Sequence, residues 1–204
     1  MLTLYGMADS GNCYKPRLLL ARLNRPFRHV EINALDGSTR RPDFLAKNPS
    51  GQVPLLELGD GRLLRESNAI LLYLAEGTPF LPEDAYGRAL VCQWLFFEQY
   101  SHEPHIAVRR ALIRYPERAA EATPEKLAAT LRGGHKALSV MEAQLAATSF
   151  IAGENYTVAD IALYAYTSDA LHAGFEMDRF PAVSAWLGRV ASEPGHVPMT
   201  WLPR

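Results

Sequence analysis

The sequence predicts an α/β N-terminal half followed by an all-helical half. Within residues 1–77, short apolar runs that suit strands alternate with segments of helical periodicity. A stretch containing Gly and Pro follows at 77–82, and from residue 84 onward strand signals almost disappear. We therefore expect one domain over residues 1–77 and a second, all-helical domain over residues 84–204.

The first half predicts a mixed sheet with helices packed on it. The expected strands are 2–5, 27–32, 55–58 and 62–65, and the expected helices are 13–24, 42–48 and 67–75. The first two strands should be parallel, because the helical segment between them can serve as the long crossover that a parallel pair needs. Gly59-Asp60-Gly61 separates the last two strands and indicates a hairpin.

The second half predicts four helices. They are expected at 85–101, 125–147, 157–171 and 181–192, with an irregular Pro-rich tail over 194–204. The third of these helices begins with Thr157-Val158-Ala159-Asp160, which fits a capping box: the threonine hydroxyl and the aspartate carboxylate each satisfy an N–H of the first turn. We interpret this box as a folding device for a buried helix.

Composition excludes several classes of partner. With 21 basic and 22 acidic side chains, the net charge of −1 gives no electrostatic reason to expect nucleic acid. No apolar run approaches the roughly 20 residues of a membrane span, and we see no signal peptide. Cys13 and Cys92 lie far apart and outside any C-x-x-C pair, which favours a reducing, cytoplasmic setting over a dithiol redox centre.

Two segments suggest a site for a peptide. If the Val53-Pro54 bond is cis, the N–H and C=O of Val53 are available to pair with an extended chain. The helix that begins at Ser67 offers unpaired N–H groups and a positive dipole end, which suit a carboxylate. Glu66 beside it could hold an ammonium group. A peptide with a free amine, a free carboxylate and a backbone would match all three features.

A third segment, Ser10-Gly11-Asn12, follows the first strand. Ligands gather at the carboxyl ends of strands in open α/β sheets, so Ser10 and Asn12 are candidates for contact with a bound molecule. Taken alone, this loop is explained more simply by N-capping of the following helix, for which Ser and Asn are preferred residue types.

Taken together, these segments resemble the cytosolic glutathione transferase superfamily. The likeness covers nearly the whole chain, and the bacterial members with Ser or Thr and then Asn in the first loop look most similar. The segments that carry it are Ser10–Arg17, Asn48–Pro54, Glu66–Ile70 and Thr157–Ile161. The resemblance implies a thioredoxin-like domain that binds glutathione, a helical domain that forms an electrophile pocket, a homodimer, and glutathione as cosubstrate.

The resemblance also implies roles for individual residues. Ser10 would donate a hydrogen bond to the glutathione sulfur, and Asn12 would assist. Six further positions would bind the rest of the tripeptide: Arg40, Gln52, Val53, Pro54, Glu66 and Ser67.

Four of these binding roles can be stated by chemical group. Val53 would pair its backbone with the cysteinyl part next to a cis Pro54, and Glu66 and Ser67 would bind the γ-glutamyl amine and carboxylate. Arg40 is the candidate for the glycyl carboxylate. Gln52 stands where related sequences often carry Lys, so a hydrogen bond replaces a salt bridge there.

Residues in the helical half are expected to border the electrophile pocket. By the resemblance these are Tyr100, Ser101 and His105. A metal site at Glu98, His102, Glu103 and His105 is the alternative, but Pro104 interrupts the helix there and no Cys supports it. We predict no metal.

Two positions depart from the family's pattern. Pro16 falls where relatives carry another apolar residue, so the first helix should begin late or leave the Asn12 carbonyl without its usual donor. Cys13 could be a reactive thiol at a helix start, or a small buried apolar residue.

The resulting hypothesis is a glutathione transferase that acts on small hydrophobic electrophiles. Two alternatives stay open: a glutathione-dependent reductase of disulfides or peroxides, and a glutathione-transferase-like binding or regulatory protein without catalysis.

Overall fold

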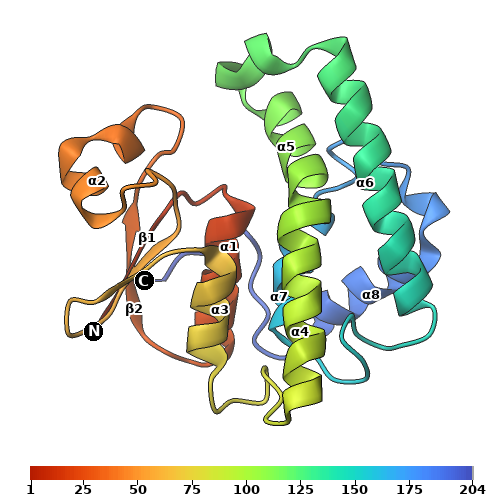
Figure 1. Ribbon diagram of the computed structural model, residues 1–204, viewed down its shortest axis with the longest axis horizontal. Coiled ribbons are helices and arrows are strands. Elements are labelled where there is room, and N and C mark those ends of the chain that lie inside the picture. The colour runs from red at the N-terminus through yellow and green to blue at the C-terminus, as the bar shows by residue number, and fades with distance from the viewer. Residues whose placement is uncertain (204) are drawn as a thin grey trace. The chain divides into compact units, whose positions relative to one another are not determined.

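The computed structural model describes residues 1–203 and divides the chain into two compact units (Figure 1). The first unit, here called the sheet unit, comprises Met1–Glu76 together with the segment from Pro194 onward. The second, the helical unit, comprises Gly77–Glu193. The expected second domain, 84–204, therefore extended too far, because the tail packs with the sheet unit.

Hydrogen bonds to α1 explain why the tail belongs to the sheet unit. The hydroxyl of Tyr14 donates to the carbonyl of Val197, and Arg17 donates to the carbonyl of Met199 at 2.7 Å. These partners lie about 180 residues along the chain from α1, at separations of 183 and 182. A local sequence pattern carries no sign of such pairings.

The sheet has the expected mixed topology. Its order is β2-β1-β3-β4, with β1 (Leu2–Gly6) parallel to β2 (Phe27–Glu31) and antiparallel to β3 (Leu55–Glu57). β4 (Leu63–Leu64) forms the predicted hairpin with β3. Both strands of the hairpin are shorter than the sequence pattern suggested.

Helices cover both faces of this sheet. Figure 1 shows α1 (Gly11–Arg22) and α3 (Ser67–Ala75) side by side on one face, with α2 (Pro42–Lys47) beyond the other. Leu18, Leu19 and Leu20 of α1 and Ile70, Leu71 and Leu74 of α3 are at most 1% exposed. Their burial holds the two helices against each other and the sheet.

Pro16 does not delay α1. The helix begins at Gly11, two residues earlier than expected, and continues through Pro16. Pro16 has no N–H to donate to the Asn12 carbonyl, so this helix lacks one of its own i to i−4 bonds.

The helical unit contains one helix that the sequence analysis missed. Its elements are α4 (Ala85–Phe97), α5 (Glu103–Arg114), α6 (Pro124–Leu145), α7 (Val158–Thr167) and α8 (Pro181–Ser192), with short 3₁₀ segments at Pro116–Glu121 and Met177–Arg179. None of the helices within residues 1–203 has the length and apolarity to cross a membrane.

The missed helix, α5, continues from α4 through a π-helical segment, Glu98–His102. Contrary to the prediction, Pro104 does not interrupt the helix. It occupies the first turn of α5, where its missing N–H costs least. The wider π turn before it makes room for the ring, which would clash with a regular helical carbonyl.

The predicted capping box at the start of α7 is confirmed. Asp160 lies fully buried and accepts hydrogen bonds from the backbone N–H groups of Ile151 and Thr157 and from the indole of Trp186. Burial raises the pKa of the Asp160 carboxyl to about 6, and the hydrogen bonds act in the opposite direction. One side chain thus joins a loop, the start of α7 and helix α8.

We predict that Asp160→Ala lowers the free energy of unfolding by about 3 kcal/mol or more, because buried N–H donors lose their acceptor. Denaturant unfolding measures the change. Asp178→Ala is the matched control: Asp178 is exposed, so its loss should change stability by less than about 0.5 kcal/mol. A loss below about 1 kcal/mol for Asp160→Ala would contradict the assigned role.

Candidate functional site

Ser10 caps the first helix of the sheet unit. Its hydroxyl oxygen accepts a hydrogen bond from the N–H of Cys13 at 3.4 Å, so the capping interpretation holds. A hydroxyl that accepts still has its own proton to donate. Ser10 therefore lies at the positive end of α1 with a proton available for a further acceptor.

Two side chains that the sequence analysis did not identify hold the loop before Ser10. Glu31, at the end of β2, accepts from the N–H of Ala8 with both oxygens, at 3.0 and 3.1 Å. Buried Arg17 donates to the carbonyl of Ala8 at 2.6 Å. The position of Glu31 at the end of the strand beside β1 could have indicated its role, whereas Arg17 reads as an ordinary helix residue.

The Val53-Pro54 bond is cis, as expected. Asn48, 1% exposed, supports the loop before it: its amide donates to the carbonyl of Gln52 at 2.7 Å, and its oxygen accepts from the hydroxyl of Ser50 at 2.9 Å. Among the described residues, none forms a hydrogen bond with the backbone of Val53. That backbone is available to an extended ligand.

Arg40 lies against the same loop. Its guanidinium donates to the carbonyl of Ser50 at 3.2 Å and covers Gly51, where a Cβ would lie 2.7 Å from Nη1. Gly51 has a φ of +61°, so a side chain is disfavoured there for two reasons. Because a guanidinium has five N–H donors, Arg40 can hold this loop and still bind an anion.

The start of α3 has the features of an anion site. Glu66 occupies the capping position, with a φ of 66°, but its side chain makes no capping hydrogen bond and is exposed. Ser67 follows and is 5% exposed. The N–H groups of the first turn, lacking a side-chain cap, suit an incoming carboxylate.

Hydrogen bonds link the starts of α1 and α3. The hydroxyl of Ser67 donates to the side-chain oxygen of Asn12 at 3.3 Å. The ammonium of Lys15 donates to the hydroxyl oxygen of Ser67 at 3.3 Å and to the side-chain oxygen of Asn68 at 3.4 Å. The structure thus brings together Asn12 and Ser67, two predicted site residues. The sequence analysis missed Lys15, although its i, i+3 spacing from Asn12 places both on one face of α1.

Cys13 lies at the start of α1 but is fully buried. Burial raises the pKa of its thiol to about 11, against the lowering effect of Ser10 and of the Met7 backbone. Its sulfur packs on Gly6 of β1, where a Cβ would come within 3.0 Å of it. These facts favour the structural interpretation of Cys13.

The three residues expected at the electrophile pocket have different environments in the helical unit. Tyr100 is 89% exposed and Ser101 is half-buried. The ring of His105 packs on α6, where a Cβ on Gly133 would lie 2.3 Å from its Nδ1. Their roles toward an electrophile stay predictions.

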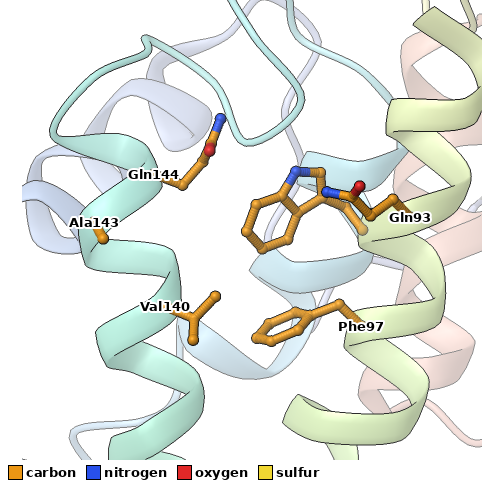
Figure 2. A pocket seen from close by; sticks show the side chains of 6 residues that line it. Gln93, Phe97, Val140, Ala143 and Gln144 are labelled. Atoms are coloured by element: carbon orange, nitrogen blue, oxygen red, sulfur yellow. The ribbon is translucent and has the colours of Figure 1, made fainter. Parts of the chain in front are cut away.

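A groove of about 390 Å³ lies between α4 and α6. Figure 2 shows Gln93 and Phe97 of α4 facing Val140, Ala143 and Gln144 of α6 across it. Of the three residues expected at the electrophile pocket, none lines this groove.

The residues that the sequence offered as an alternative metal site have other contacts. Glu98 and His102 are both buried, and Nε2 of His102 lies 2.8 Å from the hydroxyl of Thr167. Within the part of the chain that the structure describes, no group of three or more His, Cys, Asp and Glu side chains is arranged to hold a metal ion.

The fold and the site define a class. A thioredoxin-like sheet unit with a cis-proline loop, followed by an all-helical unit, is the architecture of the glutathione transferases. Family models agree: residues 1–76 match the glutathione S-transferase N-terminal domain, and residues 94–194 match the C-terminal domain. The chain belongs to the glutathione S-transferase family.

Two curated relatives represent this family. Glutathione S-transferase 3 of Zea mays is 35% identical, over 95% of this chain and 90% of its own. Disulfide-bond oxidoreductase YfcG of Escherichia coli is 28% identical, over 95% of this chain and 92% of its own.

Solved structures agree with these sequences. A glutathione S-transferase from Pseudomonas fluorescens is 49% identical, with a TM-score of 0.94 over 97% of this chain and 98% of its own. A glutathione transferase from Burkholderia graminis, solved with two glutathione molecules bound per subunit, is 25% identical, with a TM-score of 0.83 over 95% and 85% of the two chains.

We predict that Cys13 is unreactive in the folded protein. At pH 8, a pKa near 11 leaves about a hundredfold less thiolate than a pKa near 9. In a Cys92→Ala variant, an aromatic disulfide reagent should therefore modify Cys13 at least about a hundredfold faster in urea than in the native state. A Cys13→Ala variant, which reports half-buried Cys92 alone, is the control. Equal native and unfolded rates for Cys13 would contradict the structural interpretation.

Proposed function

We propose that this protein is a glutathione transferase that activates the glutathione thiol for attack on small hydrophobic electrophiles. The observation that carries the proposal is the link between Ser67 and Asn12, 3.3 Å apart. It joins the helix start suited to the γ-glutamyl end of glutathione to the loop suited to the thiol. The available backbone of Val53 supports a tripeptide lying between them.

The recognition of glutathione divides among the residues of the sheet unit. Ser67 and the N–H groups at the start of α3 hold the γ-glutamyl carboxylate, and exposed Glu66 holds the amine. Val53, preceding cis Pro54, pairs with the cysteinyl backbone. Arg40 attracts the glycyl carboxylate, and exposed Gln52 adds a hydrogen bond.

Ser10 and Asn12 act on the sulfur. A free thiol has a pKa of about 8.5, so only a small fraction is ionised near pH 7. Lowering that pKa by two units takes about 2.7 kcal/mol, which one or two charge-assisted hydrogen bonds at a helix N-terminus can supply. Ser10 donates its proton to the thiolate while its oxygen caps α1, and Asn12 assists. Ser10 is a stabiliser of the anion and neither a nucleophile nor a base.

We assign the electrophile pocket to the helical unit, with Tyr100, Ser101 and His105 at its border. We further propose a cytoplasmic homodimer that serves detoxification. Two reduced cysteines favour the cytoplasm. The exposed aromatic side chains of Phe96 and Tyr100 favour a surface that a second subunit covers.

The runner-up is a glutathione-dependent reductase. The likeness to a disulfide-bond oxidoreductase favours it. One glutathione thiolate would attack a disulfide sulfur and displace a thiol; a second glutathione would then release the other thiol and leave glutathione disulfide. A glutathione-transferase-like binding protein without catalysis is the third candidate, and lack of retention on immobilised glutathione favours it. Turnover of a chloronitroaromatic compound, against turnover of a hydroxyethyl disulfide, separates the two enzymes, and activity toward neither favours the third.

We predict that the protein is retained on immobilised glutathione and that Ser67→Ala weakens glutathione binding about tenfold or more. A hydrogen bond to a charged group contributes about 1.5–3 kcal/mol. Calorimetric titration measures the dissociation constant. Ser139→Ala, which removes an exposed hydroxyl from α6, should leave it unchanged. A wild-type protein that does not bind glutathione at millimolar concentration would end the proposal.

We predict that Ser10→Ala raises the pKa of the bound glutathione thiol by about 1–2 units, because the thiolate loses a charge-assisted donor. The ultraviolet absorbance of the thiolate, titrated against pH on the complex, measures this. The rate deficit of the variant should shrink as pH rises past the new pKa. An unchanged thiol titration would remove Ser10 from its assigned role.

A further inference from the structure

A buried lysine lies beneath the start of α3. Lys15, in the second turn of α1, has no exposed surface, and its ammonium lies 3.3 Å from the hydroxyl oxygen of Ser67 and 3.4 Å from the side-chain oxygen of Asn68. An ammonium donates and never accepts. Both oxygens are therefore acceptors for Lys15.

The donation from Lys15 decides where the proton of Ser67 points. A hydroxyl has one proton, and with Lys15 on its oxygen that proton is directed elsewhere. In this structure it is donated to the side-chain oxygen of Asn12 at 3.3 Å. A carboxylate that arrives at the start of α3 can accept it instead. The bond from Lys15 also polarises the hydroxyl and makes it a stronger donor.

The charges around Ser67 give Lys15 a second role. Glu66, the residue before Ser67, is acidic and exposed, and Gln52 in the cis-proline loop is neutral. Arg65, before Glu66, is basic, but it is exposed and its guanidinium donates to the carbonyl of Lys47 at 3.1 Å. A carboxylate ligand approaching Ser67 is therefore repelled by Glu66 and gains no charge from Gln52. The ammonium beneath the hydroxyl offsets that repulsion from inside the protein, where water screens it least.

We propose that Lys15 is a positioning residue that makes this site selective for a ligand with a free carboxylate at its γ-glutamyl end. It acts through the hydroxyl of Ser67, which it orients and polarises, and through its charge. The inference rests on the proposed function, because it takes glutathione as the ligand of the sheet unit.

Calorimetry with three peptides tests the proposal. They are glutathione, an analogue without the γ-glutamyl α-carboxylate (4-aminobutanoyl-Cys-Gly), and an analogue without the glycyl carboxylate (γ-Glu-Cys-glycinamide). Lys15→Met should raise the dissociation constants of glutathione and of the glycinamide by about tenfold each. The same substitution should change binding of the decarboxylated analogue by less than about twofold.

Matched variants separate this effect from damage to the fold. Lys47→Met removes a half-buried, ion-paired lysine of the same unit and should change none of the three affinities. Thermal melting confirms that each variant is folded. Lys15→Gln, also neutral but polar, takes the place of Lys15→Met if the latter does not fold.

A second readout is coupling to Ser67. In a Ser67→Ala background, Lys15→Met should weaken glutathione binding less than the same substitution does in the wild type. The reason is that part of the effect of Lys15 passes through the hydroxyl that Ser67→Ala removes. If Lys15→Met weakened the binding of all three peptides equally, or of none, the selectivity role would be overturned, while the proposal that the protein binds glutathione would stand. A wild-type protein that binds none of the peptides would overturn the proposed function and this inference with it.

Discussion

The candidate site depends on the contact between the starts of α1 and α3. The sheet order β2-β1-β3-β4 packs these two helices side by side on one face, although their first residues are more than 50 positions apart in the chain. The hydrogen bond from Ser67 to Asn12, 3.3 Å long, joins the two helix starts. Two positive helix ends and their polar side chains therefore converge. Neither helix alone would supply both sets of donors to an anion.

Buried polar side chains keep the surrounding loops in shape. Asn48 holds the cis-proline loop, Arg17 holds the loop before Ser10, and Lys15 holds the start of α3. Each is at most 1% exposed, so each has lost its hydration, and hydrogen bonds within the fold offset part of that cost. Among the described residues, Nε and Nη1 of Arg17 are buried without a hydrogen-bond partner. Loops braced in this way present backbone groups and hydroxyls to a ligand with little further ordering on binding.

Local signals account for what the sequence predicted well. The capping box at Thr157, the hairpin at Gly59–Gly61 and the order of strands and helices each depend on neighbours within a few residues. Long-range pairing accounts for the failures. The tail joins α1 across 182 residues, and Lys15 meets Ser67 across 52. The missed helix α5 has a local cause instead, because Pro104 follows a π turn that no periodicity indicates.

The start of α1 also shows why a helix end does not activate every thiol near it. Cys13 lies in the first turn of that helix, yet its sulfur faces Gly6 of the sheet in a fully buried position. Desolvation there outweighs the hydrogen bonds that favour its thiolate. Ser10, at the cap itself, is only half-buried. The same helix therefore leaves its own cysteine neutral, while in the proposed function its N-terminal end stabilises the sulfur of a bound ligand.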